Sequence, residues 1–131
     1  IVMLYVWGLA ERVSCTDAEK TQCKDLIEEL LEQTSRVQNE GLLCLEEMLQ
    51  EIPIGFLHTA LELTVARIEP DVMREVLEKR ILLSDTKGAA LLRRIIQLEF
   101  AICLAQNYGE ESTRTILNAL LDIDREGVGV C

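Results

Sequence analysis

The segment that decides the fold covers residues 16–53 and reads TDAEKTQCKDLIEELLEQTSRVQNEGLLCLEEMLQEIP. Thr16 and Glu19 form the Thr-x-x-Glu pattern of a capping box, which opens a helix. Apolar or small residues then recur at the three- and four-residue spacing of an amphipathic helix. They are Ile27, Leu30, Leu31, Val37, Gly41, Leu42, Leu45, Met48, Leu49 and Ile52. We therefore predict one long helix over about residues 17–50, ended by Pro53.

Gly41 lies inside this predicted helix. A glycine there costs about 1 kcal/mol in helix propensity relative to alanine. We interpret Gly41 as a position at which a neighbouring helix approaches the backbone closely.

Helical spacing continues through the next part of the chain. It predicts a short helix over residues 54–68 and another over 71–83, with Pro70 at a favourable first position. The small, polar segment that follows predicts a linker over residues 84–90.

The rest of the chain predicts two further helices over residues 91–125, separated by a break at 107–109. Together these elements predict an all-α fold, a compact bundle of about five to six helices. At 131 residues, the whole chain 1–131 is expected to form a single domain.

The first sixteen residues begin with the apolar stretch IVMLYVWGLA. Ten residues are too few to cross a bilayer, which needs about 20, and the stretch has no cationic start or cleavage site. We expect residues 1–16 to form a buried N-terminal helix. The alternative is the end of a preceding membrane helix.

The net charge of −10 argues against nucleic acid and anionic membrane surfaces as partners. Residues 17–52 hold ten acidic and three basic side chains, so most of the excess lies in this segment. Two interpretations remain open, a solvated helix face and a docking face for a basic or mixed-charge protein.

The sequence offers few groups for catalysis. His58 is the only histidine and has no nucleophile at a recognisable spacing, so we interpret it as a surface or capping residue. Glu99 interrupts an apolar run and is expected to face solvent or pair with Arg93, Arg94 or another arginine. The five cysteines form no Cys-x-x-Cys pair, and Cys44 is expected in the core, as is Cys103. We expect no catalytic residue, no metal site, no cofactor and no small-molecule substrate.

Residues 40–81 resemble the cytoplasmic loop of the flagellar motor stator A subunit, the MotA type, a relative of the TolQ and ExbB proton-channel proteins. The matching residues follow the family pattern without a gap. They are Gly41-Leu42-Leu43, Leu45-Glu46, Phe56-Leu57, Leu61, Leu63, Glu69-Pro70-Asp71, Arg74, Leu77-Glu78 and Ile81. The resemblance assigns residues 17–83 to the stator loop.

Residues 91–125 are similar to the short cytoplasmic tail of the same family. The matches are Ile95-Ile96, Glu99, Gly109-Glu110 and Ile116, with Phe100 where the family has glycine and Ser112 where it has proline. In the family, two membrane helices separate loop and tail. Only residues 82–92 separate the two segments here, so the chain resembles the cytoplasmic portions alone.

The resemblance implies a protein–protein interaction domain that faces the rotor of a flagellar motor. Glu46 stands at the family's acidic torque position, and Gln38 stands at its basic one. Arg36 lies about 160° from Gln38 around a helix. We take Gln38, Glu46, Glu47, Arg36 and Glu40 as candidate partner-binding residues.

Three classes of function follow. The first is a non-enzymatic interaction domain with a protein partner, a flagellar rotor or motor component, in the cytoplasm. The cytoplasmic face of the inner membrane, linked to a membrane stator complex, is the more specific location. The second is a structural adaptor that reuses the stator-like helical fold in another motor-associated assembly, without rotor contact or ion conduction. An enzyme is the third, and it would need a pocket with a desolvated titratable group.

Overall fold

The computed structural model describes residues 12–122, which form six α-helices and a final 3-10 turn and contain no strand. The helices are α2 (Asp17–Glu40), α3 (Leu43–Glu51), α4 (Phe56–Val65), α5 (Pro70–Leu82), α6 (Gly88–Ala105) and α7 (Glu110–Ala119), and the turn is η2 (Leu120–Asp122). The predicted all-α bundle is therefore confirmed.

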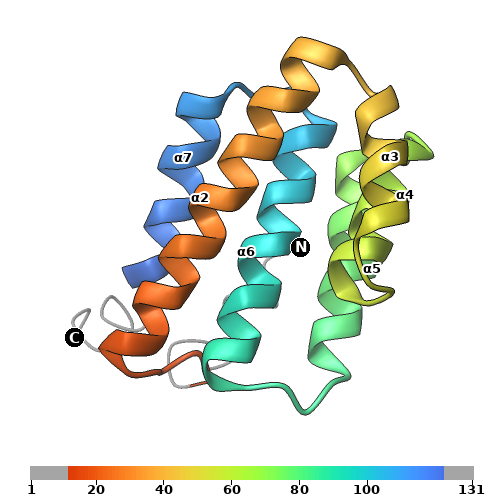
Figure 1. Cartoon of the computed structure of the whole chain (residues 1–131). Helices are drawn as coiled ribbons and strands as arrows, with labels where there is room; N and C mark the ends of the chain where they lie inside the picture. Colours follow the sequence, from red (N-terminus) through yellow and green to blue (C-terminus); the bar gives the residue numbers. More distant parts are fainter. Residues whose placement is uncertain (1–11, 123–131) are drawn as a thin grey trace.

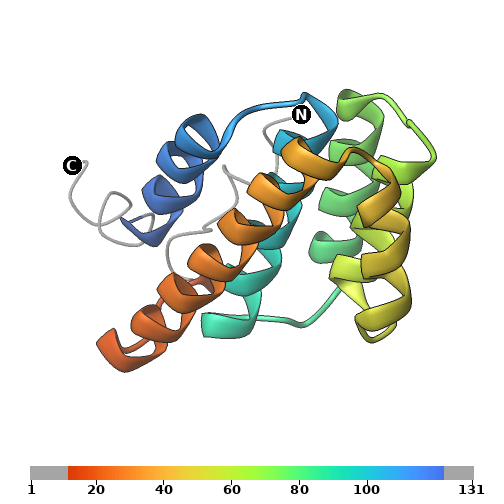
Figure 2. The same cartoon turned by 45° about the horizontal axis from the view of Figure 1, so that its top comes forward.

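Helix α6 occupies the middle of the bundle (Figure 1). Helices α2 and α7 pack on one side of it, and α4 and α5 pack on the other. Helix α3 joins the two groups by packing between α2 and α4. The second view shows the same grouping, with α3, α4 and α5 gathered at one end (Figure 2).

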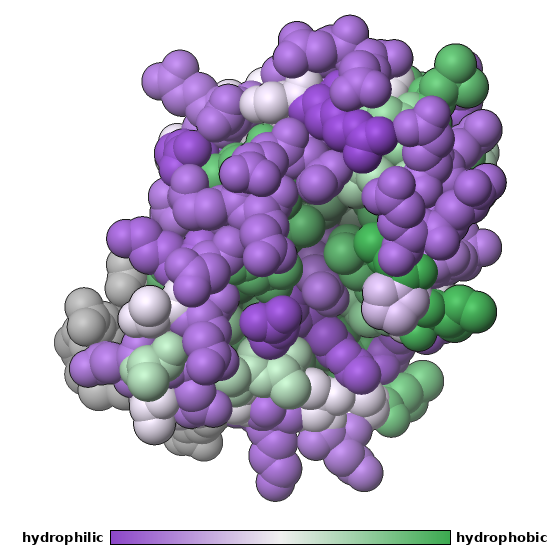
Figure 3. All heavy atoms as spheres, viewed as in Figure 1, coloured by the Kyte–Doolittle hydropathy of each residue, from purple (hydrophilic) through white to green (hydrophobic). Residues whose placement is uncertain are grey.

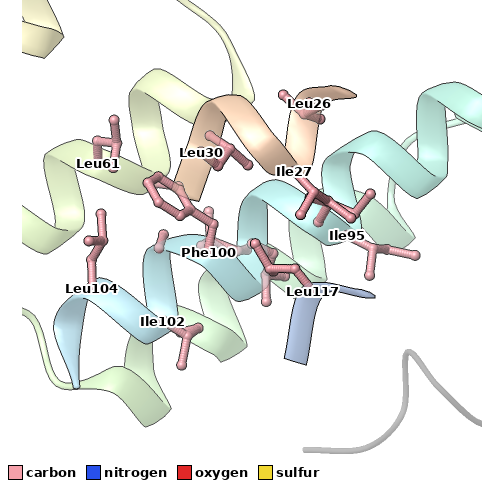
Figure 4. Close-up of a cluster of buried hydrophobic side chains, with 14 of the residues drawn as sticks. Leu26, Ile27, Leu30, Leu61, Ile95, Phe100, Ile102, Leu104 and Leu117 are labelled. Atoms are coloured by element: carbon pink, nitrogen blue, oxygen red, sulfur yellow. The ribbon is translucent and has the colours of Figure 1, made fainter. Parts of the chain in front are cut away.

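The core is built around the second half of α6. All seven residues from Leu98 to Leu104 are buried, so this part of the helix has no solvent face. Phe100 is completely buried, among side chains that include Leu30 of α2 and Leu61 of α4 (Figure 4). A helix that is apolar around its whole circumference is one that neighbours enclose, which explains the long apolar run in the sequence.

Several helix ends form as the sequence predicts. The Thr16 side chain accepts a hydrogen bond from the Glu19 amide at 3.1 Å, and the Thr16 amide donates to the Glu19 carboxylate at 2.9 Å. The predicted capping box is therefore present. Pro70 occupies the first turn of α5, and α3 ends at Glu51, two residues before Pro53.

The predicted single helix over residues 17–50 is wrong. Gly41 has φ +85° and ends α2, and a new helix, α3, begins at Leu43. A Cβ atom on Gly41 would meet nothing within 4 Å, so the expected close approach of a neighbouring helix is also wrong. Glycine is needed here because other residues rarely adopt this φ. Leu42, placed by the spacing in the apolar stripe, is 42% exposed.

Other boundaries also differ from the prediction. Helix α4 covers Phe56–Val65 and not 54–68, and α5 covers Pro70–Leu82 and not 71–83. Helix α6 begins at Gly88, so the connection after α5 is shorter than the predicted linker 84–90. Helix α7 ends at Ala119, and η2 follows it. Ser14 to Thr16 are not helical, so the helix expected over residues 1–16 does not reach its predicted end, and residues 1–11 lie outside the described part. Residues 123–125 of the last predicted segment also lie outside it.

A polar seam attaches α7 to α2. Arg114 forms ion pairs with Glu28 of α2 at 2.7 Å and with Glu110 at 3.1 Å. Ser35 of α2 donates a hydrogen bond to Glu110 at 2.9 Å. These two donors, Ser35 first and then Arg114, hold the pKa of the Glu110 carboxyl below its ordinary value.

Candidate functional site

The α2–α3 corner brings three of the predicted partner-binding residues together. Arg36, in the last turns of α2, contacts the Glu40 carboxylate at 3.3 Å and the Glu47 carboxylate at 2.9 Å. Glu40 lies one turn further along α2, and Glu47 lies on α3. Arg36 therefore bridges the two helices across the break at Gly41, and its charge is used within the molecule. Such exposed pairs stabilise a fold by at most about 1 kcal/mol each.

Glu46 differs from its neighbour Glu47 in having no ion pair within residues 12–122. It is exposed on α3, and the residues described here place no basic group within 4.0 Å of its carboxylate. Glu51, at the end of the same helix, is also exposed and has no ion pair within residues 12–122. Helix α3 carries three acidic residues and no basic one, so its surface has a local negative charge.

Large aliphatic side chains are exposed at both ends of α3. Leu43 at the first position is 73% exposed, and Ile54, three residues after the last position, is 92% exposed. Leu43, Glu46, Glu47 and Gln50 are spaced by three and four residues, so they share the outer face of the helix. We call this set, together with Glu51 and Ile54, the α3 outer face. Within residues 12–122 the carboxylates of Glu46 and Glu51 have no ion pair, so this face combines available carboxylates with apolar side chains that a partner would cover.

Gln38 does not join this surface through its side chain. Its amide Nε2 donates to the Tyr108 carbonyl at 3.4 Å, in the connection between α6 and α7. The same side chain lies beside Gly109, where an added Cβ would come within 3.5 Å of the Gln38 Nε2. The structure therefore separates Gln38 from the cluster around Arg36.

Glu99 is buried and paired, as one of the sequence alternatives proposed. Its carboxylate accepts two hydrogen bonds from Arg74 of α5, at 2.7 and 2.8 Å. The partner is therefore neither Arg93 nor Arg94. The bidentate contact lies where α5 meets α6, and it satisfies both oxygens of the carboxylate with the geometry that guanidinium groups favour.

The other groups considered for chemistry have local structural roles. His58 Nδ1 lies 3.0 Å from the Glu62 carboxylate, one turn away on α4. Cys44 and Cys103 are buried, as predicted, and burial raises the pKa of both thiols, that of Cys103 to about 11. Thiols with raised pKa values are poor nucleophiles at neutral pH because the thiolate is the reactive form.

Within residues 12–122, no cluster of three or more His, Cys, Asp or Glu side chains is arranged to hold a metal ion. Over the same residues, none of the helices combines the length and the apolar character that crossing a membrane requires. Comparison with protein-family models, curated proteins and solved structures finds no match to this chain.

The sequence analysis identified Glu46 and Glu47 of the α3 outer face but missed Glu51 and the apolar members. Leu43 falls outside the predicted helical stripe, which includes Leu42, Leu45 and Met48, and this offset was the available signal of its exposure. Ile54 lies between Pro53 and Gly55, in a segment where spacing carries no information about burial.

Proposed function

We propose that this chain is a non-enzymatic protein-interaction domain that binds a partner carrying basic and apolar side chains through the α3 outer face. One observation carries the proposal: the carboxylates of Glu46 and Glu51, which have no ion pair within residues 12–122, lie on the same short helix as the exposed Leu43, and the exposed Ile54 follows its end. Exposed apolar groups bordered by charged ones are typical of interaction surfaces.

The resemblance to stator A subunits suggests which partner to test. Glu46 stands at the family's acidic torque position, and it is also the acidic residue of the predicted set that lacks an ion pair within the described residues. A carboxylate without an internal partner is available to a basic group on another protein. The proposed partner is therefore a component of a flagellar rotor.

The proposal is tested by calorimetry with the purified rotor component of the same organism. Replacing Glu46→Lys and Glu51→Lys together is expected to weaken binding about tenfold, chiefly by slowing association, with a smaller effect as salt rises. The charge-matched control is Glu29→Lys with Glu32→Lys, both exposed on α2 and without ion pairs within the described residues. Equal loss in the test and the control would refute a specific role for α3.

A structural adaptor without rotor contact is the second candidate. The observation that favours it is the hydrogen bond from Gln38 to the Tyr108 carbonyl, because this position is basic in the stator family and serves an internal contact here. The substitution Gln38→Arg distinguishes the two candidates. The rotor hypothesis predicts tighter binding to the rotor component, whereas the adaptor hypothesis predicts no binding by either form.

A further inference from the structure

A second surface, separate from the α3 outer face except for Ile54, lies where the α3–α4 connection meets α6. It is a pocket of about 390 Å³ between residues 52–57 and the first half of α6. The connection contributes Ile54, and the first turn of α4 contributes Phe56 and Leu57. Figure 3 shows a hydrophobic patch at this connection beside strongly hydrophilic side chains over α6.

The α6 wall of the pocket is basic. Ala90, Arg93, Arg94 and Gln97 line it, and their spacing places them on one face of the helix. No acidic residue of the described chain lines the pocket. Neither Arg93 nor Arg94 has a carboxylate within 4.0 Å among residues 12–122, whereas Arg36, Arg74 and Arg114 are all ion-paired.

An aromatic contact orients one of these arginines. The Arg94 guanidinium lies over the Phe56 ring, 5.8 Å from its centroid. This distance is within the range of a cation–π interaction. The contact fixes Arg94 against the apolar wall, with a guanidinium group left to bind an anion.

We propose that this pocket binds an acidic and apolar segment of a partner protein. A carboxylate of the segment is held by Arg93 and Arg94, and an adjacent aliphatic or aromatic side chain covers Ile54 and Phe56. Guanidinium groups bind carboxylates through charge-assisted hydrogen bonds, which are stronger than neutral ones. The positive charge of the pocket selects an acidic segment, whereas the negative charge of the α3 outer face selects a basic one.

The shape of the pocket favours a protein segment over a free amphiphilic carboxylate. Ile54 is 92% exposed at the rim, and Ala90 and Arg93 are also exposed, so a small ligand would remain largely in water. Small-molecule sites bury most of their ligand. A protein segment brings its own covering surface. The net charge of −10 argues against an anionic bilayer as the occupant.

Nuclear magnetic resonance titration with two blocked tripeptides tests this proposal. The probes are acetyl-Leu-Glu-Phe-amide and its match acetyl-Leu-Gln-Phe-amide. We expect saturable shifts of the Arg93 and Arg94 side-chain resonances and of the Ile54 methyl groups with the Glu peptide. The Gln peptide should bind about fivefold more weakly, since it lacks the charge. Equal binding of the two peptides, or no shift at these residues, would overturn the proposal.

Two variants test the two walls separately. Arg93→Gln with Arg94→Gln should weaken the Glu peptide about tenfold, whereas the charge-matched control Lys24→Gln with Arg80→Gln should not. Ile54→Asn should weaken both peptides several-fold at unchanged thermal stability, because this side chain is almost fully exposed. Loss of binding in the Lys24 and Arg80 control equal to that in the test variant would contradict the assignment to the pocket.

Three further measurements separate the possible occupants. If hexanoate binds as tightly as the Glu peptide, the occupant of the pocket is a free amphiphile and not a protein segment. If the chain cosediments with anionic vesicles and this depends on Arg93 and Arg94, the occupant is a membrane surface. If the chain dimerises with rising concentration and the arginine variant abolishes this, the occupant is a second copy of the chain. The variant Glu46→Lys with Glu51→Lys should keep peptide binding, so failure of the rotor proposal is distinguishable from failure of this one.

Discussion

At the scale of single residues, the two glycines on either side of α3 make different demands on the backbone. Gly41 has φ +85° and ψ −176°, a conformation that residues with a Cβ rarely adopt. Gly55 has φ 173°, which is extended backbone open to any residue. An added Cβ would meet nothing within 4 Å at either position, so the two sites differ in conformation alone.

Gly41→Ala is therefore expected to lower the free energy of unfolding by about 1–3 kcal/mol through backbone strain. Gly55→Ala is the matched control and should have little effect or a slightly stabilising one, since alanine restricts the unfolded chain. Chemical denaturation of both variants measures the difference. Similar losses in the two variants would contradict the role given to the Gly41 backbone.

Cys103 is a second residue with a measurable signature. Burial raises the pKa of its thiol from 9.0 to about 11, although a hydrogen bond involving Thr113 acts in the opposite direction. Below pH 9 the thiol is protonated in both the folded and the unfolded chain. Between pH 9 and 11 it ionises only in the unfolded chain, which lowers stability by about 2–3 kcal/mol across this range. Cys103→Ala should remove this part of the pH dependence of the free energy of unfolding, measured by chemical denaturation between pH 9 and 11. The same pH dependence in the variant and the wild type would contradict the prediction.

At the scale of the elements, the Arg74–Glu99 pair joins α5 to α6 where both side chains are largely removed from solvent. The exposed fractions are 22% for the Arg74 side chain and 10% for that of Glu99. The Arg114–Glu28 pair between α7 and α2 has the same 2.7 Å contact, but its side chains are 41% and 48% exposed. The two pairs therefore differ in burial and in geometry, because Arg74 gives both of its terminal nitrogens to Glu99, whereas Arg114 gives one to Glu28 and the other to Glu110.

A double-mutant cycle on each pair is expected to separate them. Truncating Arg74 and Glu99 to alanine should give a coupling free energy of about 1–3 kcal/mol, because each single variant leaves a buried charge. The Arg114–Glu28 cycle should give less than about 1 kcal/mol, because water screens that pair. Unfolding in denaturant provides all the values. Equal couplings would show that burial does not set the strength of the α5–α6 contact.

The sequence predicted the elements whose signals are local. Thr16 with Glu19, Pro53 and Pro70 act on the backbone next to them, so the helix ends they mark were predicted within a few residues. The break at Gly41 was missed because Leu45 and Met48 continue the helical spacing of α2 across it. The pocket between Phe56 and Arg94 was also missed, because no local spacing brings residues of the α3–α4 connection to α6.

At the scale of the whole molecule, α6 lies between the two groups of helices and packs against both of them. Helix α6 contacts α2, α4, α5 and α7, and residues 98–104 of this helix are buried throughout. Without it, the apolar faces of α2 and α4 would be open to water. We therefore keep the prediction that residues 17–83 and 91–121 form one cooperative unit.

Deleting residues 86–131 tests this prediction, since it removes α6 and α7 together. The remaining fragment should lose cooperative thermal unfolding, because its helices cannot close a core of their own. Calorimetry of the fragment, with the whole chain as reference, measures the transition. A native-like cooperative transition in the fragment would show that α2, α3, α4 and α5 form an independent domain.

The central position of α6 also affects how the chain folds during synthesis. Translation produces α2, α3, α4 and α5 before the helix against which most of them pack. Until residue 105 has left the ribosome, the apolar faces that α6 covers in the native fold remain open, and the nascent helices can pack only on one another. Incomplete chains that expose such surfaces are prone to aggregate. Productive folding therefore waits until α6 has been synthesised, and we expect the nascent chain to depend on ribosome-associated chaperones until then.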